Sequence, residues 1–526
     1  MELNTYLGQK GYTIPKSQLT VEQQKQIRND LTIKPYIHGG ITTDQKSFPA
    51  YRESNNKFYV PHYYGIEKYG TPKDYKIPEG IDINLDFNGE LRDYQEPVVN
   101  KFMSHCNEVK YGGGLLELYC GWGKTSASLY ILSKLKKKTL VIVHKEFLMN
   151  QWIERIQQFL PKARIGKIQG PIIDIDDKDI VIGMLQSLSM KEYPAAVFES
   201  FGLTIIDEVH HISSEVFSNS LFKLVTRYML GLSATMNRKD GTTKVFKMFL
   251  GEVIFKGKRD DDRNVIVHAI EYKVEDDEFN EVKLDFRGKP AYSTMISKLC
   301  EYNRRSEFIL KILSDMLSKN PNQQVLILGH NKNLLKYLHD AISHRNIATV
   351  GYYVGGMKEA ALKISETKTA IIATYSMASE ALDIKSLTTL IMATPKTDIE
   401  QSVGRILREK HSSPIVVDII DSHNLFKNQW NKRKTFYKRE NYKIIYTNSL
   451  SYTPDTSKWS TIFNPNPSGP KECKNIKNIK NKKNITDKSN SSSDKSITND
   501  SDTEEEIDEM PKDKFACGVC LLKFKK

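Results

Sequence analysis

Residues 117–126, ELYCGWGKTS, decide the fold of this chain. An apolar run directly before this segment predicts a buried strand, and the residues after it have the spacing of a helix. Gly121 and Gly123 allow backbone torsions that a side chain would forbid, so the turn between strand and helix can wrap its amide N–H groups around an anion. The positive end of the following helix points at the same anion. The segment therefore predicts a phosphate-binding loop.

Two side chains in this loop indicate which anion it binds. Lys124 is expected to reach the β- and γ-phosphates of ATP, and Thr125 is expected to bind a magnesium ion. The full pattern has glycine five residues before Gly123, where this chain has Leu118, so a chance match in an ordinary loop is the alternative. The loop residues expected to bind the nucleotide are Cys120, Gly121, Trp122, Gly123, Lys124, Thr125 and Ser126.

Composition sets the broad class of the protein. The chain has 526 residues, enough for about three to four domains. Its net charge of +13 suits a polyanionic partner, and nucleic acid is favoured over a membrane surface because no lipidation signal or amphipathic anchor stands out. A solvated lysine-rich surface is the alternative explanation of that charge. Six cysteines and the lack of a signal-peptide pattern lead us to expect an intracellular protein, cytoplasmic or nuclear.

Residues 1–85 predict a small α+β accessory domain, because a short polar helix is followed by β-prone aromatic segments between turn residues. Basic and aromatic side chains are mixed in this domain, as on a surface that stacks nucleic-acid bases. The alternative is that the aromatic rings form the core of the domain. The side chains concerned are Tyr51, Arg52, Lys57, Tyr59, His62, Tyr63 and Tyr64.

Residues 86–255 predict the first large lobe, a parallel sheet whose strand ends bind ligand. In LRDYQ, Gln95 can exchange hydrogen bonds with an adenine, and Arg92 or Tyr94 can frame the base. Polar residues also follow the strand at 139–143 and the strand within 180–188, where they either contact a phosphodiester strand or cap the strands. These residues are His144, Lys145, Gln186 and Ser187.

The segment 203–211, LTIIDEVHH, predicts a buried strand that ends in two carboxylates. Asp207 is expected to hold the magnesium shell, and Glu208 to orient and deprotonate the attacking water. An acidic pair at a strand end is common by itself, and it gains meaning from the phosphate loop in the same sheet. Ser233 and Thr235, after the strand at 228–234, are placed to link the carboxylates with a second lobe.

LRDYQ, CGWGKT, DEVH and SATMNRKDG, in that order, resemble the motifs of superfamily 2 helicases. Ser-Ala-Thr followed by Arg238 and Asp240-Gly241 is similar to the branch that contains the xeroderma pigmentosum group B helicase, the phage UvsW helicase and the poxvirus helicase that releases nascent transcripts. The resemblance spans residues 86–445 and implies two tandem RecA-like lobes with ATP between them.

The resemblance extends into a second lobe, residues 301–454, after a charged hinge or insertion at 256–300. Segment 370–383 resembles the motif that contacts the nucleic-acid backbone, although Ala381 replaces the usual glycine. In QSVGRILR, the spacing puts Gln401, Arg405 and Arg408 on one helix face. Two guanidiniums there could meet the γ-phosphate across the cleft. This matches the arginine-finger motif of the family, and a helix with salt-bridged arginines is the alternative.

Two C-terminal segments leave alternatives open. Residues 426–443 form a basic helix with aromatic residues, which either follows a nucleic-acid groove or packs its rings on the lobe and exposes its lysines. Residues 455–526 are expected to be a disordered charged tail. Cys517 and Cys520 in that tail supply two of the four ligands that a zinc site needs, and only Cys473 lies nearby, so a free pair is favoured over zinc.

Together these patterns predict an α/β protein with a small N-terminal α+β domain, two parallel-sheet lobes and a tail. The expected activity is that of an ATP-dependent helicase or translocase on nucleic acid, with DNA favoured over RNA, acting in transcript release, repair or recombination. The alternatives are an ATP-gated factor that binds or anneals strands and a motor subunit of a transcription or replication complex. Composition and the poxvirus resemblance favour a large DNA virus, where the virus factory or the virion would be the location.

Overall fold

The computed structural model describes residues 3–35, 47–109, 112–119, 121–211, 214–236, 238, 241–257, 264–380, 382–409 and 411–465. Among these residues the chain forms two compact units. The first contains residues up to 265 together with 376–389 and 398–414, and the second contains 266–375, 390–397 and the residues from 415. Predictions for the following residues lie outside the described ranges: Cys120, Asp240, Ala381, and the tail from Asn466 with Cys473, Cys517 and Cys520.

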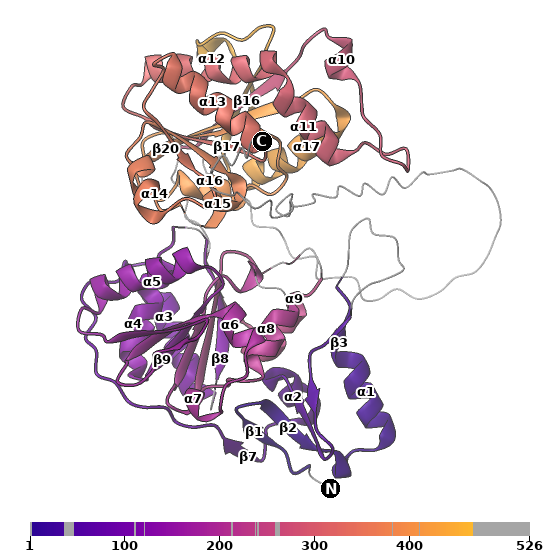
Figure 1. The fold of residues 1–526 in the computed structure, drawn as a ribbon, viewed down its shortest axis with the longest axis vertical. Helices are drawn as coiled ribbons and strands as arrows, with labels where there is room; N and C mark the ends of the chain where they lie inside the picture. The colour runs from indigo at the N-terminus through magenta and orange to yellow at the C-terminus, as the bar shows by residue number, and fades with distance from the viewer. Residues whose placement is uncertain are drawn as a thin grey trace, which may run out of the picture. The chain divides into compact units, whose positions relative to one another are not determined.

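A five-stranded sheet with the order β5-β6-β2-β1-β7 forms the N-terminal module (Figure 1). A capping box of Thr20 and Gln23 starts its helix α1, because each side chain binds the backbone of the other residue. The bounds are β1 (Tyr6–Gly8), β2 (Gly11–Pro15), α1 (Val21–Leu31), β3 (Thr32–Ile33), β4 (Phe48–Pro49), β5 (Arg52–Glu53), β6 (Lys57–Val60), α2 (His62–Tyr69) and β7 (Asp74–Lys76).

This module shares a hydrophobic core with the lobe that follows it. One buried cluster runs from Leu7 to Leu250 and includes Phe58 of β6 and Phe222 of the lobe. The phenol of Tyr63 donates a hydrogen bond to the Gly113 carbonyl oxygen at 2.9 Å and accepts one from the Gly113 N–H at 2.5 Å. The N-terminal module is therefore joined to the first lobe by buried contacts within one compact unit.

The first lobe has an eight-stranded sheet with the order β11-β10-β12-β9-β13-β14-β8-β15. Its strand pairs are parallel except β10 with β11. The strands are β8 (Gly113–Glu117), β9 (Thr139–Val143), β10 (Ile165–Gln169), β11 (Ile172–Ile173), β12 (Ile180–Met184), β13 (Leu203–Ile206), β14 (Tyr228–Ser233) and β15 (Val253–Lys256).

Helices cover both faces of this sheet, as Figure 1 shows. Buried residues of α3, α4 and α5 pack on one face, and those of α6, α8 and α9 pack on the other. Because both faces are covered, the central strands are buried and mostly apolar, as β9 is with all five residues buried. The helices are α3 (Glu96–Glu108), α4 (Lys124–Leu135), α5 (Glu146–Phe159), α6 (Leu185–Met190), α7 (Ala196–Glu199), α8 (Ser214–Leu221) and α9 (Thr243–Leu250).

A second eight-stranded sheet has the order β18-β19-β17-β20-β21-β16-β22-β23. Strand β16 lies within the segment 256–300 that the sequence assigned to a hinge or insertion, and it pairs in parallel with both β21 and β22. Charged residues on both sides of β16 hid this strand in the sequence. The strands are β16 (Ile266–Tyr272), β17 (Gln324–Gly329), β18 (Val350–Tyr353), β19 (Ala370–Thr374), β20 (Leu387–Met392), β21 (Ile415–Asp421), β22 (Lys443–Asn448) and β23 (Ser460–Phe463).

Helix α17 decides between the two readings of the basic aromatic segment. Phe426, Trp430 and Tyr437 are buried against the second unit, and Lys432 and Lys438 are exposed, so the aromatic rings belong to the core. The helices of this part of the chain are α10 (Asp277–Asn280), α11 (Tyr292–Glu301), α12 (Asn303–Lys319), α13 (Lys332–His344), α14 (Glu359–Glu366), α15 (Tyr375–Glu380), α16 (Glu400–Arg405) and α17 (Asn424–Arg439).

The prediction of an α/β protein with two parallel-sheet lobes and a small N-terminal sheet domain is confirmed. Across the described ranges, no helix combines the length and the apolar composition needed to cross a membrane.

Candidate nucleotide-binding site

The loop between β8 and α4 needs glycine at two positions. Gly121 has φ +83° and Gly123 has φ +90°, both in the region that L side chains rarely adopt. A Cβ atom at Gly123 would lie 2.4 Å from Gln95 Nε2 and 3.1 Å from Ser126 Oγ. Gly123 is also the N-cap of α4, so the free N–H groups of that helix begin at the loop. The backbone therefore has the form that phosphate binding requires.

The order of the strands brings the acidic pair to this loop. Strand β14 lies between β13 and β8, and all three are parallel, so their carboxyl ends share one edge of the sheet. Lys124 Nζ is 2.6 Å from Glu208 Oε1, although 84 residues separate them in the chain. Glu208 has φ +46°, a left-handed conformation that is costly for a glutamate and is held by its surroundings. The structure thus brings the predicted lysine and the predicted base into contact.

Asp207 is the most enclosed charged group at this edge, with 7% of its surface exposed. Its Oδ1 accepts a hydrogen bond from the Glu208 N–H at 3.0 Å, and its Oδ2 accepts one from Trp152 Nε1 at 2.9 Å. Burial and the neighbouring Glu208 carboxylate raise the pKa of Asp207 above its ordinary value, while Lys124 opposes that shift. A divalent cation beside this carboxylate would favour its ionised form, so Asp207 fits the expected magnesium site.

His210 connects Glu208 to two further side chains. Its Nδ1 lies 2.6 Å from Ser233 Oγ and 3.3 Å from Glu208 Oε2, and its Nε2 lies 2.9 Å from Gln401 Nε2, all within the first compact unit. Burial lowers the pKa of His210 to about 4, so the ring is neutral at pH 7. Because the Gln401 amide donates to Nε2, the ring proton lies on Nδ1 and faces Glu208 and Ser233. Ser233 therefore contacts the carboxylate site through His210.

Gln95 lies against the phosphate loop rather than in the open. It is 3% exposed, and its Nε2 donates to the carbonyl oxygens of Trp122 at 3.2 Å and Gly123 at 3.3 Å. Its Oε1 accepts a hydrogen bond from the Arg92 N–H at 3.0 Å. Tyr94, 42% exposed, packs edge-on against Trp122 at 5.5 Å and binds the Arg92 guanidinium through its hydroxyl at 2.6 Å. The structure brings these residues together, and their contact with adenine stays a prediction.

The arginines at and beyond the end of α16 contact a turn that follows α15. Arg405 Nη1 donates to the Leu382 carbonyl oxygen at 2.8 Å, and Arg408 donates to the same oxygen at 2.8 Å and pairs with Asp383. A Cβ atom at Gly121 would lie 3.6 Å from the Cα atom of Arg408, so this segment passes the phosphate loop in the first unit. The action of either guanidinium on a phosphate stays a prediction.

Two residues of this site were missed as site residues in the sequence. Trp152 was assigned no role in the site from the sequence, and its indole N–H in fact binds Asp207. His210 was quoted only as part of a motif. The signal for Trp152 was an indole, which carries one donor, on a helix that follows a ligand-binding strand. No local pattern identifies the carboxylate that this donor reaches, because the contact depends on the neighbouring strand β13.

The polar residues proposed to contact a nucleic-acid strand have protein partners. His144 is buried, Gln186 Nε2 donates to the His144 carbonyl oxygen at 2.7 Å, and Ser187 Oγ accepts from the Gly170 N–H at 2.9 Å. These contacts are those of strand caps. Contact of Lys145 with nucleic acid stays a prediction.

The basic and aromatic residues of the N-terminal module fall into two groups, one on helix α2 and one on the sheet. His62, Tyr63 and Tyr64 lie on α2, where the Tyr64 hydroxyl donates to Asp30 Oδ2 at 3.0 Å and the imidazole of His62 is buried. By contrast, Tyr59 of β6 and Tyr6 of β1 both pair with Thr13 of the central strand β2. Their side chains therefore lie on the face of the sheet opposite the buried Phe58. Base stacking stays a prediction for that outer face, where the cations near the two rings are Lys57, Lys76 and Lys10.

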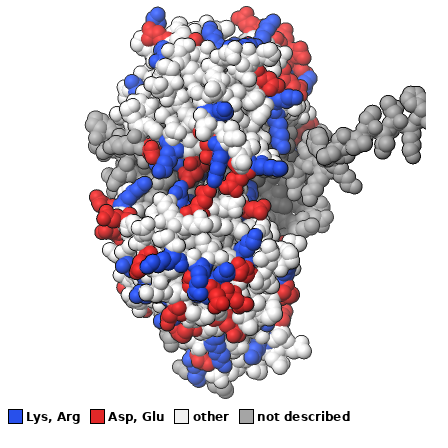
Figure 2. Space-filling model, turned by 60° about the vertical axis from the view of Figure 1, so that its left-hand side comes forward, with Lys and Arg blue, Asp and Glu red and all other residues white. Residues whose placement is uncertain are grey.

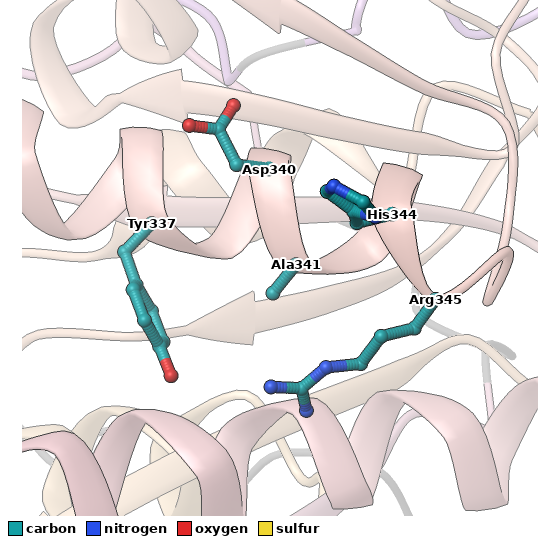
Figure 3. A pocket seen from close by; sticks show the side chains of 5 residues that line it. All are labelled: Tyr337, Asp340, Ala341, His344 and Arg345. Carbon is teal, nitrogen blue, oxygen red and sulfur yellow. The ribbon is translucent and has the colours of Figure 1, made fainter.

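The surface charge on one face and one hollow on α13 were also candidates for a site. On the face drawn in Figure 2, lysine and arginine side chains are interspersed with aspartate and glutamate, so this face carries no single positively charged track. A hollow of 410 Å³ on α13 is lined by Tyr337, Asp340, Ala341, His344 and Arg345 (Figure 3). Arg345 is bound through two nitrogens to Glu307, which also accepts from Tyr337. Within the described ranges, no group of three or more His, Cys, Asp or Glu side chains could hold a metal ion.

Comparison with known proteins identifies the family. Residues 88–238 match the family model described as type III restriction enzyme, res subunit. The chain is 35% identical over 459 residues to a mimivirus protein (L396, Acanthamoeba polyphaga mimivirus) that is named as an ATP-dependent RNA helicase, covering 84% of this chain and 86% of the relative. An African swine fever virus protein (QP509L, isolate Pig/Kenya/KEN-50/1950) is also named as an ATP-dependent RNA helicase. It is 28% identical to this chain over 401 residues, covering 71% of this chain and 78% of the relative.

The crystal structure of T4 UvsW is also similar, at 16% sequence identity and a TM-score of 0.34, covering 85% of this chain and 100% of that chain. The family assignment is carried by the sequence relatives. The resemblance stated from the motifs is confirmed by the mimivirus relative and by the family model. The chain belongs to the superfamily 2 helicases, a family of nucleic-acid-dependent ATPases, and its relatives here are the ATP-dependent helicases of large DNA viruses.

Proposed function

We propose that this protein is a motor that hydrolyses ATP to move along, unwind or remodel nucleic acid. The observation that carries the proposal is the contact of Lys124 with Glu208 at 2.6 Å, beside the buried Asp207 and the glycine loop. These are the residue types that phosphoryl transfer to water requires, and they meet at the sheet edge where nucleotides bind in parallel α/β proteins.

The residues present fit a nucleotide and a magnesium ion. The loop amides and Lys124 would hold the phosphates, and Thr125 and Asp207 would hold the cation, with Gln95 and Arg92 at the base. Two protein ligands suffice for magnesium, which keeps several waters and binds phosphate oxygens. When bound, magnesium ATP supplies the γ-phosphoryl group whose transfer to water releases the free energy for movement.

The strength of the Glu208 carboxylate as a base depends on whether it is paired with Lys124. While Lys124 holds Glu208, the carboxylate is a weak base, because a nearby cation stabilises its ionised form. A phosphate that binds Lys124 competes for this cation, and Glu208 is then released to take a proton from water. The neutral His210 ring lies 3.3 Å from Glu208 Oε2 and limits the space into which the carboxylate can move. Arg405 and Arg408 would offset the charge that develops during transfer.

DNA is the track that we propose, and transcript release, repair or recombination the process, on the resemblance to the branch described above. RNA is the second candidate, because two relatives carry RNA helicase in their names. The backbone contacts expected of such motors do not by themselves distinguish the two polymers. A factor that binds or anneals strands without unwinding them is the rival from another class.

The test is ATP turnover with single-stranded DNA, duplex DNA and RNA added separately at fixed salt, followed by strand displacement on the polymer that stimulates. Stimulation by DNA, absent in Lys124→Ala, supports the DNA motor. Stimulation by RNA alone moves the track to RNA. Turnover without strand displacement favours the rival factor, and no turnover with any polymer overturns the proposal.

A further inference from the structure

A β-hairpin between α10 and α11 exposes an apolar face. Eleven large hydrophobic side chains are exposed among the described residues, and three of them fall within five residues of this segment: Val282 at 41%, Leu284 at 59% and Phe286 at 86%. Val282 and Leu284 come directly before the turn and Phe286 lies within it, so the three exposed side chains gather at one hairpin tip. Single exposed apolar residues are ordinary on a protein surface, and three within five residues are not.

The hairpin is held in a defined shape. Leu284 pairs with Pro290 in an antiparallel bridge, and the Ala291 N–H donates to the Lys283 carbonyl oxygen at 2.8 Å. At the turn, Gly288 has φ +72°, and Asp285 Oδ1 accepts hydrogen bonds from the N–H groups of Arg287 at 2.8 Å and Lys289 at 2.9 Å. The apolar face is therefore presented by an ordered turn.

The base of the hairpin is tied to the second unit. Lys298 Nζ, from α11, donates to the Glu281 carbonyl oxygen at 2.5 Å, and the Lys283 N–H contacts Met295 Sδ at 3.3 Å. Phe279 of α10, directly before the hairpin, is fully buried. Figure 1 shows the segment running outward from α10 and returning to α11. A force on the tip would thus be passed to the body of the unit.

The charges around the apolar face suit a nucleic-acid strand. Three cations alternate with the apolar residues: Lys283, Arg287 and Lys289. The Arg287 guanidinium lies 4.8 Å from the centre of the Phe286 ring, so one cation and one aromatic ring are offered together. The two carboxylates of the hairpin are engaged, Glu281 with Lys283 at 2.6 Å and Asp285 with the turn backbone.

The size of the face also favours a strand over a protein. A stable protein interface buries about 800 Å² on each partner, far more than three side chains at a hairpin tip can offer. One base stacked on one ring needs only the area of that ring, and stacking contributes about 1–3 kcal/mol for each base. Cations spaced along the strand can meet the phosphates on either side of that base.

We propose that residues 281–291 form a second nucleic-acid contact, in which Phe286 stacks on an unpaired base and Arg287 and Lys289 bind adjoining phosphates. This inference rests on the proposed function, because it requires a nucleic-acid track. It goes beyond the motor site by assigning a contact to a segment that lies outside every helicase motif quoted above.

The test is the affinity of the full chain for a labelled single strand of about 20 nucleotides, as DNA and as RNA, measured by fluorescence anisotropy. Phe286→Ala is expected to weaken binding about tenfold, and Phe286→Trp to stay within about threefold of the unchanged protein, because stacking tolerates any large ring. Ile364→Ala is the matched control, since Ile364 is 61% exposed on α14 of the same unit and lies outside the hairpin. It should leave affinity unchanged.

A second measurement tests the cations and the contact itself. Lys289→Ala is expected to lower the slope of log affinity against log salt by about 0.7, the value for one phosphate contact on a single strand. A strand that carries 5-iodouracil should cross-link to the peptide containing Phe286 on irradiation, and this cross-link should be lost in Phe286→Ala.

The proposal is overturned if Phe286→Ala binds as tightly as Ile364→Ala, or if Phe286→Trp binds as weakly as Phe286→Ala. Failure of the proposed function gives a different result. A protein whose ATP turnover no polymer stimulates contradicts the motor, whereas stimulated turnover with unchanged affinity in Phe286→Ala contradicts the hairpin contact alone.

Discussion

Asp207 and Glu208 in the first sheet and Asp418 and Asp421 in the second stand in contrasting positions. The first pair follows β13, at the edge of its sheet, where Glu208 meets Lys124 with side-chain exposures of 19% and 11%. The second pair lies within β21, where Asp421 binds Arg305 and Asp418 binds Arg433, all with at most 1% of the side chain exposed.

This difference separates two uses of an ion pair in the same architecture. A pair at a sheet edge can exchange one partner for a ligand, because water and solutes reach it. A pair sealed in the core cannot exchange, and the loss of one partner leaves a buried charge. The first sheet therefore leaves its charges accessible to a ligand, and the second uses them to fix the position of α12 and α17 on the sheet. Substitutions at the first pair should then lower activity with little change in stability, and substitutions at the second pair should lower stability.

Glu208→Gln should give the largest effect. Removal of the base is expected to lower polymer-stimulated ATP turnover by about 10²- to 10⁴-fold, because the amide cannot take a proton from water. Thermal unfolding should change little, since the side chain lies at the sheet edge. Glu252→Gln is the control, because Glu252 is exposed and pairs only with Lys247 in the described contacts. Turnover in Glu208→Gln equal to that of the control would remove Glu208 from the mechanism.

Arg433→Met should act on stability. Asp418 would keep its charge without a guanidinium, and the loss of one partner of a buried pair costs about 3–5 kcal/mol. Tyr437, which also donates to Asp418 Oδ2 at 2.9 Å, cannot replace a cation. Urea unfolding followed by circular dichroism measures the change. Arg439→Met on the same helix, where the arginine side chain is 59% exposed, should cost under about 1 kcal/mol. Equal midpoints for the two variants would contradict the contrast between core and edge.

The second sheet should also lose stability in mild acid through His268 on β16. Burial lowers the pKa of His268 to about 4, from an ordinary value near 6.5. The unfolded chain then binds more protons than the folded chain between these values, so stability falls as pH drops below about 6.5 and this loss is complete below about 4. At pH 5 the free energy of unfolding lost through His268 is about 2 kcal/mol. His268→Phe should flatten the pH dependence of urea unfolding, and an unchanged slope would show that His268 does not cause it.

The motifs predicted the parts of the first sheet edge because each part is local. A strand, a glycine turn and a lysine at a helix start are encoded within ten residues, as Gly121, Gly123 and Lys124 are. The contacts between parts were not predicted, because they depend on strand order. Nothing near Trp152 or Gln401 in the sequence indicates Asp207 or His210, and β16 was hidden because its partners β21 and β22 follow it by more than 140 residues.

Trp152→Phe should give the smallest of these effects and the sharpest test of how the edge is organised. Trp152 Nε1 holds Asp207 Oδ2 at 2.9 Å from a position that is 1% exposed, so it positions the carboxylate without facing solvent. Phenylalanine keeps an aromatic side chain, smaller than the indole, and removes the donor. A hydrogen bond to a charged group contributes about 1.5–3 kcal/mol, and part of that should appear as an approximately tenfold higher magnesium concentration for half-maximal turnover.

A purely structural role would predict something else. Trp430→Phe on α17 removes an indole of similar burial, 8% exposed, from the second unit and should lower stability without changing the magnesium requirement. Binding of ADP measured by calorimetry gives a readout apart from turnover. In Trp152→Phe, magnesium should strengthen ADP binding less than in the unchanged protein, while binding of ADP without magnesium stays the same. Equal losses in both conditions would mean that Trp152 supports the fold and not the carboxylate, and the first sheet edge would then depend on Lys124 and Glu208 alone.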